Sequence, residues 1–288
     1  MLKLKDYINS ERERVFIKIE KPSLVTESLK LLSRHQQTLI DEKVRLVNRL
    51  GKKLLEVCPQ ILELGKLKNK KMIAILAKYP DFSKYKRITL KSLLKIKGIG
   101  KIQAPFLLKR LNNIEYMSGL TDIYKTIISS YAKRIMQLQR EIKDIDKSLD
   151  EIGGKNKEVN HLKTIPGVAT KLASRFIGEI GDINRFPSEK QLAVYCGIAC
   201  VDNNSGKITK ARVVYKANKI CKQTLITMAG CSIRFSFQCK DYYLKKRTEG
   251  KSHNHTLRCL ARQLIKVIYR MLTEDREYIV RKELKKVA

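Results

Sequence analysis

Nine apolar residues recur at alternating steps of four and three, which is the a/d pattern of a coiled-coil seam. They are Tyr124, Ile128, Tyr131, Ile135, Leu138, Ile142, Ile145, Leu149 and Ile152. A pattern sustained this long predicts one helix over about 120–152, and Gly153-Gly154 ends it. This helix restricts the chain to folds that cover a long apolar stripe.

A second, weaker stripe runs from about Leu24 to Leu55, and Cys58-Pro59 closes it because proline disfavours a helical residue before it. Its members are Leu32, Leu39, Ile40, Val44, Val47, Leu50 and Leu54, with Gln36 interrupting them. We expect the helices around 24–57 and 120–152 to associate, either antiparallel within one chain or across a dimer. An ordinary helical bundle is the alternative to a true coiled coil.

Two segments have a helix-hairpin-helix pattern. In the first, at 90–111, Lys97-Gly98-Ile99-Gly100 lies between two apolar helical stretches; the second begins at His161 and turns at Pro166-Gly167-Val168. Glycines permit the tight turn, and amides at the next helix start can face a phosphate. The nucleic-acid-binding candidates here are Gly98, Gly100, Lys101, Gly167 and Lys171. The alternative is that both hairpins are plain packing elements, and Ala169 makes the second one degenerate.

The charge of the chain indicates a polyanionic partner. Lys and Arg total 61 against 28 Asp and Glu, a net charge of +33, which disfavours an enzyme of small neutral substrates. No run of about 18 uncharged apolar residues exists, and the start "MLKLKDYINSERERVF" lacks the apolar middle of a signal peptide. We therefore expect a cytoplasmic protein that binds DNA or structured RNA and no membrane.

The seven cysteines are expected to be reduced thiols. A zinc site built from Cys196, Cys200 and the later Cys and His residues is disfavoured, because no Cys-x-x-Cys pair or matched knuckle spacing occurs. The sequence thus predicts no metal site and no cofactor in this chain.

The stretch "YCGIACVDNNSGKITKARVVYK", residues 195–216, turns from apolar to polar, presents the hydroxyl of Ser205 and continues into cations. From Lys207 to Lys222 there are six cations and no acid, which indicates a phosphate track. These six are Lys207, Lys210, Arg212, Lys216, Lys219 and Lys222. The last helix should be core, with Leu257, Leu260, Leu264, Ile268 and Leu272 facing inward.

The segment "IPGVATKLASRFIGEIGDINRFPSEKQLAVYCGIACVDNNSGK" resembles the C-terminal domain of insertion-sequence 110 family transposases, relatives of the Piv DNA invertases. The family's ordered motifs are matched by Ile165-Pro166-Gly167, Glu179-Ile180-Gly181-Asp182, Arg185-Phe186, Tyr195 with Gly197, Ser205-Gly206-Lys207 and Gly250-Lys251. The middle third is similar as well, through "SRHQQTLIDEKVRLVNRLGKKLLEVCP" and "AILAKYP". Departures occur at Ile198-Ala199-Cys200 and at Ala217-Asn218, where the family has Leu-Ala-Pro and Gly-Asn.

This resemblance implies a DNA transposase or site-specific recombinase in which Ser205 is the nucleophile and forms a phosphoserine link. Lys207, Lys210, Arg212, Lys216, Lys219 and Lys251 would contact DNA. DNA is the implied partner, with a structured guide RNA as a further candidate, and a homo-oligomer, a dimer or tetramer, is expected. The implied fold is mainly α: long coiled-coil helices, helix-hairpin-helix elements and a compact helical C-terminal domain with a small strand/turn insertion.

Family members begin with a ribonuclease-H-like domain whose Asp-Glu-Asp-Asp set binds magnesium. Here Asp6, Glu11, Glu13 and Glu20 lie in a polar start without a strand pattern, so that domain is expected to be missing. We expect residues 1–23 to be a linker remnant, 24–157 the coiled-coil region and 158–288 the transposase domain. Such a chain would be inactive alone or depend on a carboxylate domain supplied in trans, with its magnesium. The alternative is a non-enzymatic DNA- or RNA-binding remnant that modulates an intact transposase.

Overall fold

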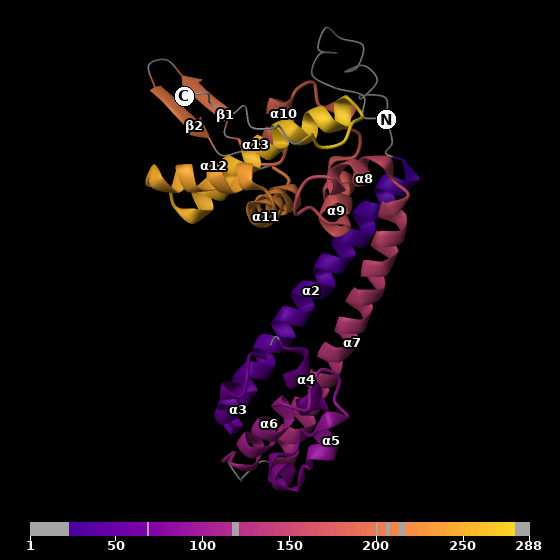
Figure 1. Ribbon diagram of the computed structural model, residues 1–288, viewed down its shortest axis with the longest axis vertical. Coiled ribbons are helices and arrows are strands. Elements are labelled where there is room, and N and C mark those ends of the chain that lie inside the picture. Colours follow the sequence, from indigo (N-terminus) through magenta and orange to yellow (C-terminus); the bar gives the residue numbers. More distant parts are fainter. Residues whose placement is uncertain are drawn as a thin grey trace, which may run out of the picture. The chain divides into compact units, whose positions relative to one another are not determined.

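The computed structural model describes residues 23–67, 69–116, 121–199, 201–205, 208–212 and 217–279. For Thr121 and the strand residues within 201–212 it describes the backbone alone. The fold is mainly α, as predicted, with one two-stranded sheet among the described residues (Figure 1). The predictions for residues 1–22, which include the four acids of the polar start, lie outside the described residues.

The described chain divides into two compact units. Unit 2 is His35–Lys147, and unit 1 joins the residues up to Arg34 with those from Ser148 onward. Two long helices, α2 (Leu24–Val57) and α7 (Thr121–Gly154), each contribute to both units. The predicted boundary at 157/158 therefore differs from the observed grouping, because the beginning of α2 and the end of α7 pack with the C-terminal helices.

Within unit 2, α2 and α7 pair antiparallel. The Arg134 guanidinium donates to Glu42 at 3.1 Å, the Tyr124 hydroxyl donates to Glu56 at 3.3 Å, and the side chains of Gln36 and Asp146 are hydrogen-bonded. Residue numbers therefore increase along α2 as those of their partners decrease along α7. This association occurs inside the chain, so the apolar seam is covered without a second copy, and oligomeric state stays a prediction.

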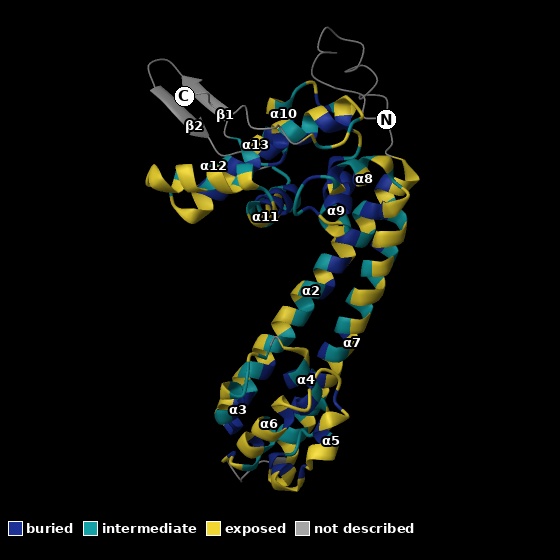
Figure 2. Ribbon diagram, in the orientation of Figure 1, coloured by how far each residue is buried: buried dark blue, intermediate teal, exposed yellow. Residues whose placement is uncertain are grey.

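The predicted burial of the apolar stripe of α7 is confirmed, since all nine of its residues are buried or half-buried (Figure 2), while a true coiled coil stays a prediction. In α2 the prediction was wrong at Val44, which is exposed, while Gln36 is buried in the seam. The reason is the hydrogen bond between Gln36 and Asp146, which satisfies a polar side chain at a core position. The predicted helix ends were correct, since α2 stops before Cys58-Pro59 and α7 stops at Gly154.

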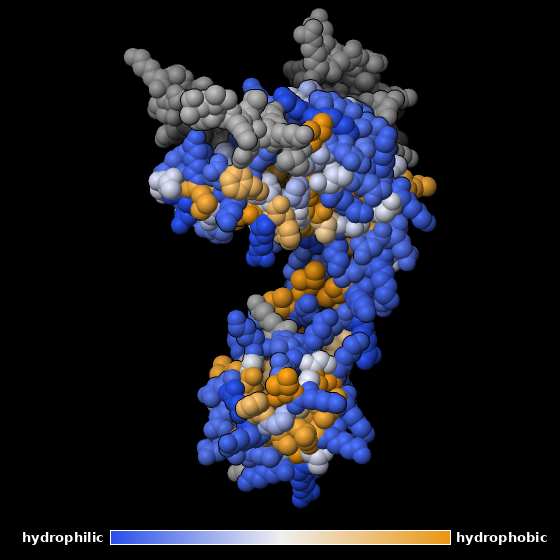
Figure 3. Space-filling model, in the orientation of Figure 1, coloured by the Kyte–Doolittle hydropathy of each residue, from blue (hydrophilic) through white to orange (hydrophobic). Residues whose placement is uncertain are grey.

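Short helices fill the remainder of unit 2 and share one apolar core with the two long helices, around fully buried side chains such as Ile73, Leu76 and Tyr85. In chain order these are α3 (Gln60–Glu63), α4 (Lys70–Lys78), the 3-10 helix η2 (Phe82–Arg87), α5 (Leu90–Leu94) and α6 (Gln103–Asn112). In Figure 3 hydrophilic side chains cover most of the visible face of unit 2, with hydrophobic side chains gathered near its centre.

Unit 1 is built from helices that pack around α9, α11 and α13. The elements are α8 (Lys157–Lys163), α9 (Thr170–Ile180), the 3-10 helix η3 (Ile183–Arg185), α10 (Glu189–Tyr195), β1 (Val201–Ser205), β2 (Ile208–Arg212), α11 (Lys219–Phe235), α12 (Phe237–Thr248) and α13 (His253–Thr273). Helix α9 contacts α8 and α11, while α13 contacts α10, α11 and α12. The five inward positions predicted for the last helix are all buried.

Helix α9 lies unusually close to the beginning of α2. A Cβ on Gly178 would lie 2.6 Å from the Lys30 backbone nitrogen and 2.9 Å from the Lys30 Cα. Only glycine permits two helix backbones to approach this closely without displacing one of them. This contact attaches residues 24–34 to unit 1.

The predicted strand insertion is an antiparallel hairpin between α10 and α11. Val201 pairs with Arg212, and Ser205 pairs with Ile208 at the turn end of the ladder. The six described cysteines, all but Cys200, are free thiols as expected. None of the described helices has the length and apolar character needed to cross a bilayer.

Candidate functional site

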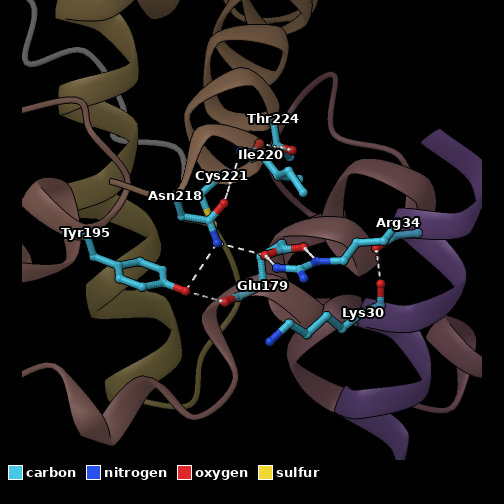
Figure 4. A network of polar contacts seen from close by, with 9 residues as sticks. Lys30, Arg34, Glu179, Tyr195, Asn218, Ile220, Cys221 and Thr224 are labelled. Atoms are coloured by element: carbon cyan, nitrogen blue, oxygen red, sulfur yellow. Dashed lines mark hydrogen bonds and ion pairs between the residues drawn. The ribbon is translucent and has the colours of Figure 1, made fainter. Parts of the chain in front are cut away.

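A buried carboxylate, that of Glu179 on α9, organises the region where the hairpin leaves the helical body (Figure 4). Its side chain is 0% exposed, and it accepts two parallel hydrogen bonds from Arg34, from Nε at 2.7 Å and from Nη2 at 2.9 Å. The Asn218 amide donates a third bond at 2.7 Å. A charge that is paired and fully hydrogen-bonded in this way is tolerated inside a protein.

The pKa of Glu179 follows from these contacts. Burial alone would raise the pKa of this carboxyl, but the hydrogen bonds from Arg34 and Asn218 outweigh burial and hold the pKa below its usual value. Glu179 is therefore ionised at neutral pH and occupied by its partners. It serves to position other residues and is poorly suited to act as a general base.

Asn218 joins the two ends of the hairpin segment. Its backbone amide donates to the Tyr195 carbonyl at 2.8 Å, and its side-chain amide donates to the Tyr195 hydroxyl at 3.2 Å. Its side-chain oxygen also caps α11 by accepting from the amides of Ile220 and Cys221. One side chain thereby fixes the last turn of α10, the first turn of α11 and the buried carboxylate.

Tyr195 and Gly197 complete this base. The Tyr195 hydroxyl donates to the Glu179 carbonyl at 2.9 Å. Gly197 has φ +64°, and a Cβ there would lie 2.8 Å from the Cβ of Ala217. The Tyr-x-Gly motif is thus explained: the tyrosine bonds to α9, and the glycine lets the chain turn against the residue before Asn218.

Arg185 lies beside this base with hydrogen-bonding capacity left over. Its guanidinium is 4.6 Å from the ring centres of both Phe186 and Tyr195. Its Nε and Nη2 are shielded from solvent, and no hydrogen-bond acceptor contacts them within the described part of the chain. Two unused donors on a fixed cation are suited to hold an anionic oxygen.

The candidate nucleophile Ser205 is the last residue of β1, and its side chain is outside the described residues. Of the predicted cations, Lys210 and Arg212 belong to β2, while Lys207 and Lys216 lie outside the described residues. Lys219 is exposed in the first turn of α11. Lys251 bonds Glu249 at 2.6 Å, so its charge is already paired.

The two predicted hairpins differ in their backbones. Gly98 has φ +93° and is exposed, as a tight turn requires, whereas a Cβ on Gly100 would meet open space, so nothing there demands glycine. The amides of Gln103 and Ala104 at the start of α6 already bond the Gly100 carbonyl. Lys101 is exposed. Because these amides already have an acceptor, they are poorly placed to bind a phosphate. Phosphate contact by the exposed Lys101 side chain stays a prediction.

In the second hairpin, Gly167 has φ +86° and packs against the backbone of α11, where a Cβ would lie 2.8 Å from the Cys231 carbonyl carbon. Close packing is thus sufficient to explain this glycine. Lys171 lies in the first turn of α9. Nucleic-acid contact by either residue stays a prediction.

Sequence reasoning identified Glu179 only as part of a motif and assigned Arg34 no role. The available signal was a single acid in the apolar stretch "FIGEIG", which predicts a buried carboxylate that needs a cationic partner. The partner lies 145 residues away, so no spacing rule identifies it. The described part of the chain holds no group of three or more His, Cys, Asp or Glu residues placed to bind a metal ion.

Comparison with known proteins finds a family match within the C-terminal part of the chain. Residues 159–244 match the family described as Transposase IS116/IS110/IS902. The 44.8 kDa protein of insertion element IS116 from Streptomyces clavuligerus is 26% identical over 271 residues, covering 91% of this chain and 68% of the relative. The 42 kDa protein of IS900 from Mycobacterium paratuberculosis is 30% identical over 53% of this chain and 39% of its own length.

A pilin gene-inverting protein from Moraxella bovis is 26% identical over 166 residues, which are 57% of this chain and 50% of that protein. The matched regions thus span about two thirds of the IS116 protein and half or less of the other two relatives. The residues of the polar base, Glu179, Tyr195 and Asn218, all fall inside the segment 159–244.

Proposed function

We propose that the chain, whose residues 159–244 match the IS116/IS110/IS902 family of transposases, takes part in DNA transposition or inversion, with Ser205 as the nucleophile that attacks DNA. The observation that carries the proposal is the polar base around Glu179. It holds both ends of the hairpin that bears Ser205, and reactive groups need a rigid support to keep a productive geometry.

In the proposed step the Ser205 Oγ forms a bond to phosphorus, and the bond from phosphorus to one deoxyribose oxygen breaks. The phosphoserine link retains the energy of the broken bond for rejoining. The serine proton passes to a base, and the released deoxyribose oxygen takes up a proton. Because a serine hydroxyl is a weak nucleophile until it is activated, the base is expected from a carboxylate domain of the family's type, which also binds magnesium.

The cations near the hairpin support DNA as the substrate. Lys210 and Arg212 follow Ser205 on the second strand, and Lys219 begins the next helix. Positive groups beside a phosphodiester stabilise the charge that develops on its oxygens in the transition state. A structured guide RNA and a homo-oligomer belong to the same proposal.

The experiment adds the ribonuclease-H-like domain of a full-length relative, with magnesium and a DNA end from the element, and looks for a protein–DNA adduct on denaturing gels. Ser205→Ala should abolish the adduct and leave DNA affinity nearly unchanged, because one hydroxyl adds little to so basic a surface. Ser188→Ala is a matched control, since this serine caps α10 and is not proposed to react.

An adduct that persists in Ser205→Ala refutes the assignment. Absence of an adduct from both proteins, with DNA binding intact, favours the alternative of a non-enzymatic DNA- or RNA-binding protein that modulates an intact transposase.

A further inference from the structure

Unit 2 has a groove of about 670 Å³ between the end of α4, the turn after α5 and the middle of α7. We call it the basic groove, because five of its ten lining residues are cations and none is an acid. The cations are Lys78, Lys95, Lys97, Lys133 and Arg140. Lys and Arg make up about a fifth of the whole chain, 61 of 288 residues, so the groove is enriched in positive charge beyond what composition explains.

The charges of the basic groove are not neutralised. In the described residues no ion pair involves any of the five, and Lys78 donates to a neutral acceptor, the Ser92 carbonyl, at 3.0 Å. All five side chains are exposed. Elsewhere in unit 2 cations do find acids, as Arg134 does with Glu42 and Lys53 with Glu56. A cluster of cations without acids makes the local electrostatic potential positive, and a positive potential attracts an anionic ligand.

We propose that the basic groove binds the phosphodiester backbone of a nucleic acid, as a contact separate from the C-terminal domain. Lys133 and Arg140 are seven residues apart on α7, so they lie on one face with a separation of roughly 10 Å along the helix axis. Successive phosphates of one strand advance about 3.4 Å along a duplex. The α7 wall therefore extends past about three phosphates, which fits a polymer better than a single small anion.

The floor of the groove also suits a backbone. Ala74 and Ala77 are small, and Ile96 and Met136 are apolar, so sugar carbons can lie against them while phosphates face the rim. The inference does not depend on serine chemistry, because the groove lies in unit 2, outside residues 159–244. Loss of the Ser205 adduct and loss of groove binding are thus separate results.

The test replaces Lys95, Lys97, Lys133 and Arg140 by Gln in the full chain. A matched control replaces four exposed cations of unit 2 that do not line the groove, Arg45, Arg49, Lys52 and Lys91. Affinity for a 20-base-pair duplex of DNA, and separately of RNA, is measured over a range of salt concentrations. The magnitude of the slope of log affinity against log salt concentration should decrease by about 0.9 for each DNA phosphate that the groove variant no longer neutralises. We therefore expect a decrease of roughly 2 to 4 for the groove variant and of less than about 1 for the control.

A photocrosslinking residue in place of Gln137, which lines the groove and is exposed, should crosslink to the bound duplex. The same residue in place of Lys52 should not. A slope change confined to RNA assigns the groove to RNA, and one confined to DNA assigns it to DNA. Equal effects of the two quadruple variants, or no crosslink at position 137, overturn the proposal.

Discussion

Glu179 is a buried anion whose partner, Arg34, is half exposed, with 49% of its side chain accessible. Loss of the ion pair should therefore cost the carboxylate more free energy than the guanidinium. Arg34 can be hydrated where it lies, whereas the buried Glu179 cannot. Removing the carboxylate charge leaves Arg34 and Asn218 with a weaker acceptor at the base of the hairpin. The consequence should appear as lower stability, with reduced function following from it.

Glu179→Gln is expected to lower the free energy of unfolding at pH 7 by roughly 1.5–3 kcal/mol, the range for hydrogen bonds to charged groups. The wild-type advantage should also depend on pH. Because the folded pKa lies below the unfolded value of about 4.3, the contribution is fully present above that value and is lost as pH falls through the folded pKa.

Urea unfolding between pH 3 and pH 7 measures this difference. Glu151→Gln, at an exposed position on α7, serves as the control and should show almost no change over the range. A constant difference between wild type and Glu179→Gln down to pH 3 would contradict the role given to this carboxylate.

Among the elements, the contact between α9 and α2 makes the sharpest claim about packing. Gly178→Ala should destabilise the protein by about 1–3 kcal/mol, because an added methyl group forces two backbones apart. Gly230→Ala in α11 is the matched control: a Cβ there meets nothing within 4 Å, so alanine should stabilise the helix by about 0.5–1 kcal/mol. Thermal unfolding of both variants tests whether the first substitution destabilises the protein and the second stabilises it. A change in the same direction for both would contradict the close approach of α9 and α2.

The long helices were predictable from sequence, since an apolar period with a proline or glycine boundary determines both α2 and α7 locally. The grouping of residues 24–34 with unit 1 was not, because it depends on contacts such as that of Gly178 with Lys30. The apolar stripe of α2 was also predicted incompletely. Val44 was assigned to it but is exposed, whereas Gln36 is buried because it bonds to Asp146, a residue distant in sequence.

At the scale of the whole molecule, the net charge of +33 predicts binding dominated by phosphate contacts. Affinity for duplex DNA should fall steeply with salt, with a log–log slope of about −0.9 for each phosphate neutralised. Fluorescence anisotropy between roughly 50 and 300 mM salt gives the slope directly. Binding that does not change with salt, or no binding at low salt, would exclude this mode.

The most direct measurement for the central claim is to identify the atom that carries the DNA. An adduct trapped with the complementing carboxylate domain is digested with protease and nuclease, and the nucleotide-bearing peptide is sequenced by mass spectrometry. The predicted result is a nucleotide phosphate on Ser205, in the peptide between Tyr195 and Lys210. A phosphate on a tyrosine, or on a serine outside the hairpin, would contradict the account.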